Sequence, residues 1–180
     1  MRVIAGSAKG HSLKTPKGLY TRPTTDKVKG SLFSMLMGHL ADAKVLDLFA
    51  GSGGLGIEAL SRGAKECVFV DMDSDAVSCI KENLAFTKTK EKARVVQGDS
   101  LQFLKTESSP FDLIFIDPPY HHNLGAKSME LIFSQNLLKS GGLVSLETDE
   151  GELETEEFEG FELIKSKSYG RISLKIYKKY

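Results

Sequence analysis

Short apolar runs of strand length alternate with amphipathic stretches of helix length between about residue 44 and residue 147. The runs are rich in Val, Ile, Leu and Phe, which is typical of strands buried on both faces of a parallel sheet. The expected strands are Val45–Phe49, Cys67–Val70, Arg94–Val96, Leu113–Ile116 and Leu143–Leu146. This alternation predicts an α/β fold with a mostly parallel sheet.

Helical spacing of apolar residues fills the gaps between these strands. One helix is expected after Asp73, and another before a turn at Gly141-Gly142. A further helix is expected before the sheet, with Thr24 or Thr25 as its N-cap and Asp26 in its first turn. Its apolar stripe consists of Val28, Leu32, Met35 and Leu36.

The end of the chain has the pattern of an antiparallel hairpin. Two strands are expected, Phe161–Lys167 and Ile172–Tyr177, joined at Tyr169-Gly170. The length of 180 residues corresponds to about one domain. We therefore expect a single domain over residues 1–180, in which 1–43 form an extension and 44–180 form the core.

Apolar runs and cysteines narrow the class of protein further. No run approaches the ~18 apolar residues that cross a bilayer, and the first residues lack the apolar stretch of a signal peptide. The two cysteines, Cys67 and Cys79, show no metal-ligand spacing. We expect a cytoplasmic protein with no metal site and no membrane partner.

The net charge is zero, but the charges are unevenly distributed. Residues 1–44 hold eight basic and two acidic residues, and residues 164–180 hold six basic residues and no acidic one. A single surface lysine is ordinarily just solvated. Taken as a set, the basic N-terminal segment fits a surface that contacts phosphates.

A glycine-rich turn follows the first expected strand. The segment from Val45 to Gly56 predicts a strand, a tight turn and a helix that begins near Gly54. Glycines at 51, 53 and 56 allow the backbone to turn and to approach a ligand closely. They match the G-x-G-x-x-G pattern, and Asp71 stands 20 residues after Gly51, where a dinucleotide fold keeps its ribose-binding acid. An NAD site and purely structural glycines therefore both remain alternatives here.

The sharpest motif is Asp117-Pro118-Pro119-Tyr120, directly after the fourth expected strand. The amino nitrogen of a base is a poor nucleophile because its lone pair is delocalised into the ring. A carboxylate and a backbone carbonyl that accept its hydrogens would localise this lone pair. Asp117 supplies the carboxylate, the prolines fix the turn, and Tyr120 offers a ring on which a flipped base can stack. The alternative is a tight turn without chemistry.

A third motif, Gly98-Asp99-Ser100, follows the third expected strand at the same edge of the sheet. An aspartate at this edge could hold the amino group of an adenine. The alternative interpretation is a turn with a helix N-cap.

Over nearly its whole length the sequence resembles the RsmD family of 16S ribosomal RNA guanine-N2 methyltransferases. The N-terminal segment Arg22-Pro23-Thr24-Thr25-Asp26-Lys27-Val28 is the most discriminating part of the match. The other matching segments are Arg2-Val3-Ile4-Ala5-Gly6, Lys9-Gly10, Leu32-Phe33, Leu46-Asp47-Leu48-Phe49-Ala50-Gly51-Ser52-Gly53, Asp117-Pro118-Pro119-Tyr120 and Tyr169-Gly170.

The resemblance implies a fold and an activity. The fold is a Rossmann-like class I methyltransferase with a seven-stranded, mostly parallel sheet, a reversed last strand, and an N-terminal β-hairpin plus helix. The activity transfers a methyl group from S-adenosylmethionine, which leaves as S-adenosylhomocysteine, to the N2 amino group of a guanine. The implied partner is ribosomal RNA, within a small ribosomal subunit or an assembly intermediate, and the implied oligomeric state is a monomer.

The resemblance also implies roles for residues of this chain. The catalytic loop would be Asp117, Pro118, Pro119 and Tyr120; some members carry phenylalanine in place of Tyr120, which puts a required hydroxyl in doubt. The cofactor would be bound by Thr25, Asp47, Phe49, Ala50, Gly51, Ser52, Gly53, Leu55, Gly56, Asp71, Met72, Asp99 and Ser100. RNA would be contacted by Lys9, His11, Arg22, Lys27 and Lys29.

Two rival functions share some of these motifs. An adenine-N6 DNA methyltransferase uses the same four-residue motif, but about 180 residues leave little room for a region that reads major-groove edges. A nucleotide-binding module without activity belongs to a different class. The Asp-Pro-Pro-Tyr motif at the catalytic edge argues against it.

Overall fold

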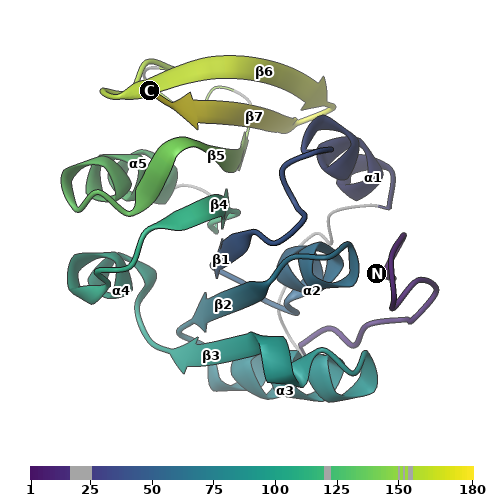
Figure 1. The fold of residues 1–180 in the computed structure, drawn as a ribbon. Helices are drawn as coiled ribbons and strands as arrows, with labels where there is room; N and C mark the ends of the chain where they lie inside the picture. The colour runs from purple at the N-terminus through teal and green to yellow at the C-terminus, as the bar shows by residue number, and fades with distance from the viewer. Residues whose placement is uncertain (17–25, 120–122, 150, 152, 154–155) are drawn as a thin grey trace.

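The computed structural model describes residues 1–180 except 17–25, 120–122, 150, 152 and 154–155 (Figure 1). The helices are α1 (Asp26–Met35), α2 (Gly54–Ser61), α3 (Ser74–Phe86), the 3-10 turn η1 (Lys90–Lys92), α4 (Ser100–Thr106) and α5 (Leu124–Ser134). The strands are β1 (Lys44–Leu48), β2 (Glu66–Asp71), β3 (Ala93–Gln97), β4 (Phe111–Ile116), β5 (Leu138–Asp149), β6 (Phe161–Tyr169) and β7 (Ile172–Lys179).

The seven strands form one sheet in the order β3-β2-β1-β4-β5-β7-β6. The first five are parallel, and β7 pairs antiparallel with both β5 and β6. The predicted mostly parallel sheet with a reversed last strand is therefore confirmed. Because β1 and β4 lie at the centre, the segments that follow them emerge side by side at the carboxyl edge of the sheet, where ligands bind in such folds.

One expected boundary is wrong. The turn expected at Gly141-Gly142 lies inside β5, which already begins at Leu138. Gly141 takes a left-handed φ of 75°, and the pairing of β4 with β5 shifts in register between Phe111 and Leu113. The glycines therefore form an irregularity within a long strand, a use of strand glycine that apolar periodicity does not distinguish from a turn.

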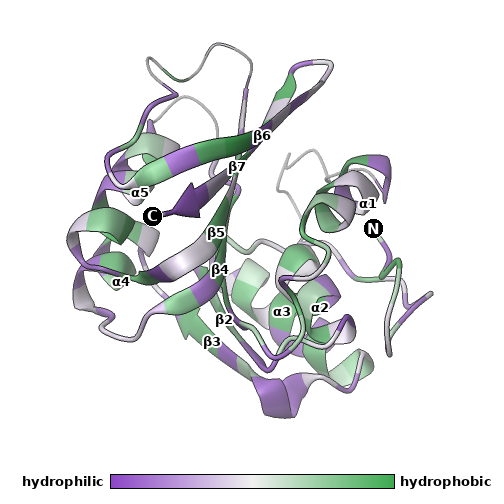
Figure 2. Ribbon diagram, turned by 45° about the horizontal axis from the view of Figure 1, so that its top comes forward, coloured by the Kyte–Doolittle hydropathy of each residue, from purple (hydrophilic) through white to green (hydrophobic). Residues whose placement is uncertain are grey.

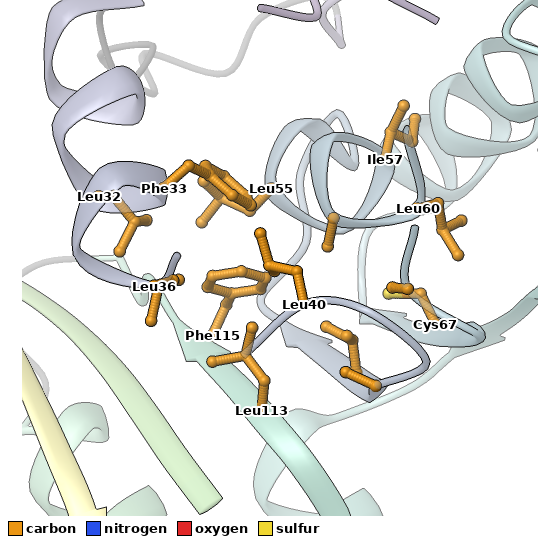
Figure 3. Packing of buried hydrophobic residues seen from close by; sticks show 14 of the residues in the cluster. Leu32, Phe33, Leu36, Leu40, Leu55, Ile57, Leu60, Cys67, Leu113 and Phe115 are labelled. Carbon is orange, nitrogen blue, oxygen red and sulfur yellow. The ribbon is translucent and has the colours of Figure 1, made fainter. Parts of the chain in front are cut away.

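Helices cover both faces of the sheet, α1, α2 and α3 on one side and α4 and α5 on the other (Figure 2). The hydrophobic core is therefore divided into two clusters, one on each face of the sheet. Phe33, Leu36, Leu55, Leu60 and Phe115 belong to the cluster on the α1 side, which Figure 3 shows. Because side chains alternate along a strand, neighbouring residues such as Ile114 and Ile116 join the cluster on the α4 side.

The N-terminal extension packs on the core. In the described part of the extension, the expected hairpin is reduced to a single antiparallel bridge between Arg2 and Ser12, supported by backbone bonds such as Val3 N–H to His11 O, 2.9 Å. Val3, Ala8 and Leu13 are buried in the same cluster as α1 and α2. Among the described helices, none is long and apolar enough to cross a membrane.

Candidate active site

The loop between β1 and α2 carries left-handed backbone at three positions. Phe49, Gly51 and Gly53 have φ values of 62°, 57° and 76°. The Ala50 N–H donates to Val70 O, 3.0 Å, and so ties the loop to β2. Left-handed backbone strains a side-chain residue such as Phe49, and such strain is typical of ligand-binding turns.

The three glycines of the motif serve different purposes. A side chain at Gly51 would meet no heavy atom within 4 Å, so the backbone there faces open space. A Cβ at Gly56 would overlap the Phe69 ring of β2. Gly51 therefore fits a close approach by a ligand, whereas Gly56 is required by helix–strand packing; this corrects the expectation that all three glycines approach the ligand. Leu55 is likewise turned into the core.

Asp71, at the end of β2, binds the loop that follows the neighbouring strand β1. Its Oδ2 accepts the Gly51 N–H at 2.8 Å and its Oδ1 accepts the Asp73 N–H at 3.0 Å. Each oxygen keeps a further lone pair, and the side chain is half-buried. Met72 beside it is 71% exposed at the mouth of the site. Both positions suit contact with a nucleoside.

Asp47 supports the loop from within the protein. Its carboxylate is buried and accepts the Gly56 N–H at 2.8 Å. Burial raises the pKa of Asp47 well above its ordinary value. The side chain therefore holds the start of α2 in place beneath the loop.

Asn83 of α3 is a residue of the site that the sequence analysis missed. Its Nδ2 donates to Ser52 O at 2.9 Å and to Lys14 O at 3.0 Å, while its Oδ1 accepts the Lys14 N–H at 2.9 Å. The side chain is 1% exposed. Asn83 thus joins the glycine-rich loop to the N-terminal extension, and no local motif marks an asparagine in mid-helix for this purpose.

Asp117, Pro118 and Pro119 follow β4 at the carboxyl edge. Pro118 is buried, Pro119 is exposed, and Asp117 is half-buried. Burial raises the pKa of Asp117 to about 6. Tyr120, the fourth residue of the motif, lies outside the described residues.

Glu147 is a second acid at this edge and was also missed. Because Ile116 of β4 pairs with Leu146 of β5, Asp117 and Glu147 follow on adjacent strands and on the same face. Glu147 is 5% exposed, and burial, with the negative charge of Asp117, raises its pKa to about 8. Two acids so placed do not both ionise easily, so the pair retains a proton near neutral pH.

Asp99 and Ser100 form the start of α4. The Asp99 Oδ1 accepts the Gln102 N–H at 2.7 Å, which makes Asp99 the N-cap that the alternative interpretation described. Asp99 is nevertheless exposed, and it lines a cleft of about 290 Å³ together with Gly98 and Phe103. Ser100 is buried.

The residues expected to contact RNA have different surroundings. Lys9 and Lys27 are exposed, and His11 is half-buried with its ring edge-on to Phe86, 4.9 Å between centroids. The expectation for Lys29 is wrong, because its side chain is fully buried. Arg22, and Thr25 of the cofactor set, lie outside the described residues.

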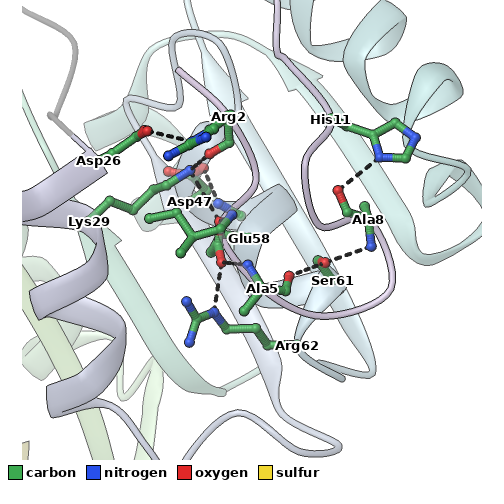
Figure 4. A network of polar contacts seen from close by, with 12 residues as sticks. Arg2, Ala5, Ala8, His11, Asp26, Lys29, Asp47, Glu58, Ser61 and Arg62 are labelled. Carbon is green, nitrogen blue, oxygen red and sulfur yellow. Dashed lines mark hydrogen bonds and ion pairs between the residues drawn. The ribbon is translucent and has the colours of Figure 1, made fainter.

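Lys29 belongs to a buried polar network instead (Figure 4). Its ammonium lies 3.1 Å from Glu58 Oε2 and donates to Arg2 O. Glu58 also accepts the Ile4 N–H at 2.8 Å, the Ala5 N–H at 3.0 Å and Arg62 Nε at 2.7 Å. Burial lowers the pKa of Lys29, although Glu58 opposes this shift. The network fastens α1 and the N-terminal segment to α2.

The doubly covered sheet, the glycine-rich loop with its strand-end acid, and the Asp-Pro-Pro turn together define a Rossmann-like class I methyltransferase. The chain belongs to the family described as Conserved hypothetical protein 95, whose model matches residues 1–178, and the resemblance to the RsmD family is thereby confirmed.

Relatives and solved structures agree with this assignment. Ribosomal RNA small subunit methyltransferase D of Haemophilus influenzae is 40% identical over 98% of this chain and 93% of its own. The protein of the same name in Escherichia coli K12 is 36% identical over 83% of this chain and 75% of its own. The solved structure called "Putative methyltransferase yhhF from Escherichia coli" superposes with a TM-score of 0.91 and 34% identity, covering 99% of this chain and 97% of that one.

Proposed function

We propose that this chain transfers a methyl group from S-adenosylmethionine to the N2 amino group of a guanine in 16S ribosomal RNA. The observation that carries the proposal is the placement of Asp117, followed by two prolines, beside the loop at 49–53 on the central strands of a methyltransferase sheet. We further propose that the chain acts as a monomeric, cytoplasmic, single-domain enzyme on the small ribosomal subunit or its assembly intermediate.

The residues at the carboxyl edge fit S-adenosylmethionine. Asp71 would accept hydrogen bonds from the ribose hydroxyls with the lone pairs that Gly51 and Asp73 leave free. The open side of Gly51 would admit the methionine portion, and Met72 and Asp99 would flank the adenine. When bound, this cofactor supplies a methyl group on a sulfonium centre that is already activated for displacement.

Asp117 prepares the amino group of the base. Its carboxylate, when ionised, accepts one N2 hydrogen, and a carbonyl of the proline turn accepts the other, so that the lone pair is directed at the incoming methyl group. Because burial raises the Asp117 pKa to about 6, the group is mostly ionised at pH 7. A protonated Asp117 would lose much of this acceptor capacity.

A methyl-transfer assay with labelled S-adenosylmethionine tests the proposal. The substrates are small ribosomal subunits that lack the modification, naked 16S ribosomal RNA and duplex DNA, and the product nucleoside is identified. Label in N2-methylguanosine from RNA is the expected result. Label in N6-methyladenine from DNA would replace the proposal by the adenine methyltransferase alternative, and no transfer to any of the three would overturn it.

A further inference from the structure

The edge strand β6 changes faces part-way along its length. Leu163 pairs with Tyr177, which packs on the α5 side of the sheet. An irregularity follows between Leu163 and Lys165, after which Lys165 and Lys167 pair with Ile176 and Leu174 of the α1-side cluster. Paired residues of antiparallel strands point to the same face. The irregularity therefore directs the two lysines to the face that also carries Asp117.

These lysines lie along α1. Lys165 Nζ is 3.3 Å from Met35 O, and Lys167 Nζ is 3.4 Å from Ser31 Oγ. The Tyr169 hydroxyl also contacts Ser31, and Lys167 lies over the Tyr169 ring at 5.5 Å. Both lysines remain exposed, so their charges are held in place while they face solvent.

The same hairpin ends at the catalytic edge. The turn after Tyr169 carries Arg171, whose side chain is 79% exposed and lies 3.8 Å from Asp149. Asp149 pairs with Ile172 and stands two residues beyond Glu147 on β5. The first turn of α1 contains the exposed Lys27.

Described acidic residues beside the hairpin lie next to cations, as Asp149 does with Arg171. In the segment that leads from β5 to β6, Leu153 and Phe158 pack against the cluster on the α5 side. Glu156 in this segment pairs with Lys175 at 3.2 Å. On β6 itself, Glu162 lies at the opposite end of the strand from the catalytic edge and pairs in register with Lys178, whereas Lys165 and Lys167 follow towards that edge.

We propose that Lys165, Lys167 and Arg171 form a second RNA-binding surface, the β6 track, which continues from the exposed Lys27 of the extension and holds phosphates of the ribosomal RNA next to the target base. This inference rests on the proposed function and adds a contact that the N-terminal extension does not supply. Side chains two residues apart on one face of a strand are about 7 Å apart, which is close to the separation of successive phosphates along one RNA strand. The exposed cations, spaced in this way, favour a polyanion on the α1 face.

The test compares Lys165→Gln/Lys167→Gln with the matched control Lys90→Gln/Lys92→Gln. The control lysines are exposed on η1, which leads into β3 at the far edge of the sheet. Binding to naked 16S ribosomal RNA is measured against salt concentration, and the Michaelis constant is measured with small ribosomal subunits. Cofactor affinity and the melting temperature are followed in parallel.

We expect the β6 variant to weaken RNA binding about 5- to 20-fold and to lower the steepness of log affinity against log salt by about 1.5 for two lost contacts. Cofactor affinity and the control variant should stay at the wild-type value. Arg171→Gln should add a further loss in the same direction. An unchanged salt slope would overturn the inference, as would a loss confined to assembled subunits, which would indicate a ribosomal protein as the partner.

Failure of this inference is distinguishable from failure of the proposed function. If wild-type protein methylates guanine in the subunit while the β6 variant keeps the wild-type salt slope, only the β6 track is wrong. If wild-type protein transfers no methyl group to RNA, the proposed function itself fails.

Discussion

The aspartates at the carboxyl edge of the sheet have different roles because they differ in their hydrogen-bond partners. Asp47 and Asp71 each accept backbone N–H groups, and so they hold the loop and the start of α2 in position. No side-chain partner within hydrogen-bond distance is found for Asp117 in the part of the chain that the structure describes. That leaves its oxygens available to an incoming amino group.

Replacing Asp117 by alanine should therefore impair the chemical step specifically. We expect Asp117→Ala to lower kcat by roughly 10² to 10³, because one preorganised polar contact is lost from the transition state. The affinity for S-adenosylmethionine, measured by calorimetry, should change little. Turnover close to the wild-type rate would contradict the role given to Asp117.

Glu147 should make stability depend on pH. Its pKa is raised to about 8 in the folded protein, so between about pH 4.5 and 8 the folded state binds more protons than the unfolded chain. Stability must then fall as pH rises through this window. Glu147→Gln removes the ionisation, and we expect it to raise stability at pH 8.5 by about 1 to 3 kcal/mol while leaving stability at pH 4 nearly unchanged.

Thermal melts of wild-type and Glu147→Gln protein across pH 4 to 9 measure this effect. The negative charge that acts on Glu147 comes from Asp117, which follows the neighbouring strand β4. Asp112→Asn at the amino end of β4 provides a control acid whose pKa is lowered instead. Equal melting differences at pH 4 and pH 8.5 would refute the shifted ionisation.

Between elements, the contact of α2 with β2 sets the position of the cofactor loop. Gly56 is the point of closest approach, because a Cβ there would overlap Phe69 and also meet Cys67 Sγ. We expect Gly56→Ala to destabilise the fold by about 2 to 4 kcal/mol through overpacking, as measured by urea denaturation.

Two further variants make this expectation specific. Gly98→Ala is the matched control, since a Cβ at Gly98 meets nothing within 4 Å and its φ is not left-handed. The double variant Gly56→Ala/Phe69→Leu should recover part of the loss by removing ring atoms that overlap the new methyl group. A Gly56→Ala protein as stable as Gly98→Ala would show that the helix can move away from the strand without penalty.

Helices and strands could be predicted from the sequence more completely than the tertiary contacts of individual side chains. Strands β1, β2 and β4 were predicted nearly to their ends because buried parallel strands are continuous apolar runs. Asp117 and Asp71 could be placed because a motif and a fixed spacing mark them. Asn83, Glu147 and the buried state of Lys29 could not be predicted, since each depends on which residue faces it across the fold, and polar residues within helices and strands are ordinarily exposed.

Across the whole molecule, a buried carboxylate is one of the groups that join the extension to the core. Glu58 of α2 gathers donors from Lys29 of α1, from the backbone at Ile4 and Ala5, and from Arg62. Because α2 directly follows the loop at 49–53, the Glu58 network helps to fix the position of the extension, and of any RNA contact that it makes, relative to this loop. A buried charge network of this kind is sensitive to the loss of one partner, because the others remain desolvated.

The two sides of the Lys29–Glu58 pair should for this reason respond unequally to mutation. Lys29→Met leaves Glu58 with Arg62 and two backbone donors, and we expect a loss of about 1 to 3 kcal/mol. Glu58→Met leaves two N–H groups without an acceptor and a buried ammonium with only the Arg2 carbonyl and no counter-charge, and we expect a loss of about 3 to 5 kcal/mol. Urea denaturation measures both, and Lys27→Met, on the exposed position of the same helix, is the control. A Lys29→Met protein less stable than Glu58→Met would mean that the lysine, rather than the carboxylate, is the centre that holds the extension to the core.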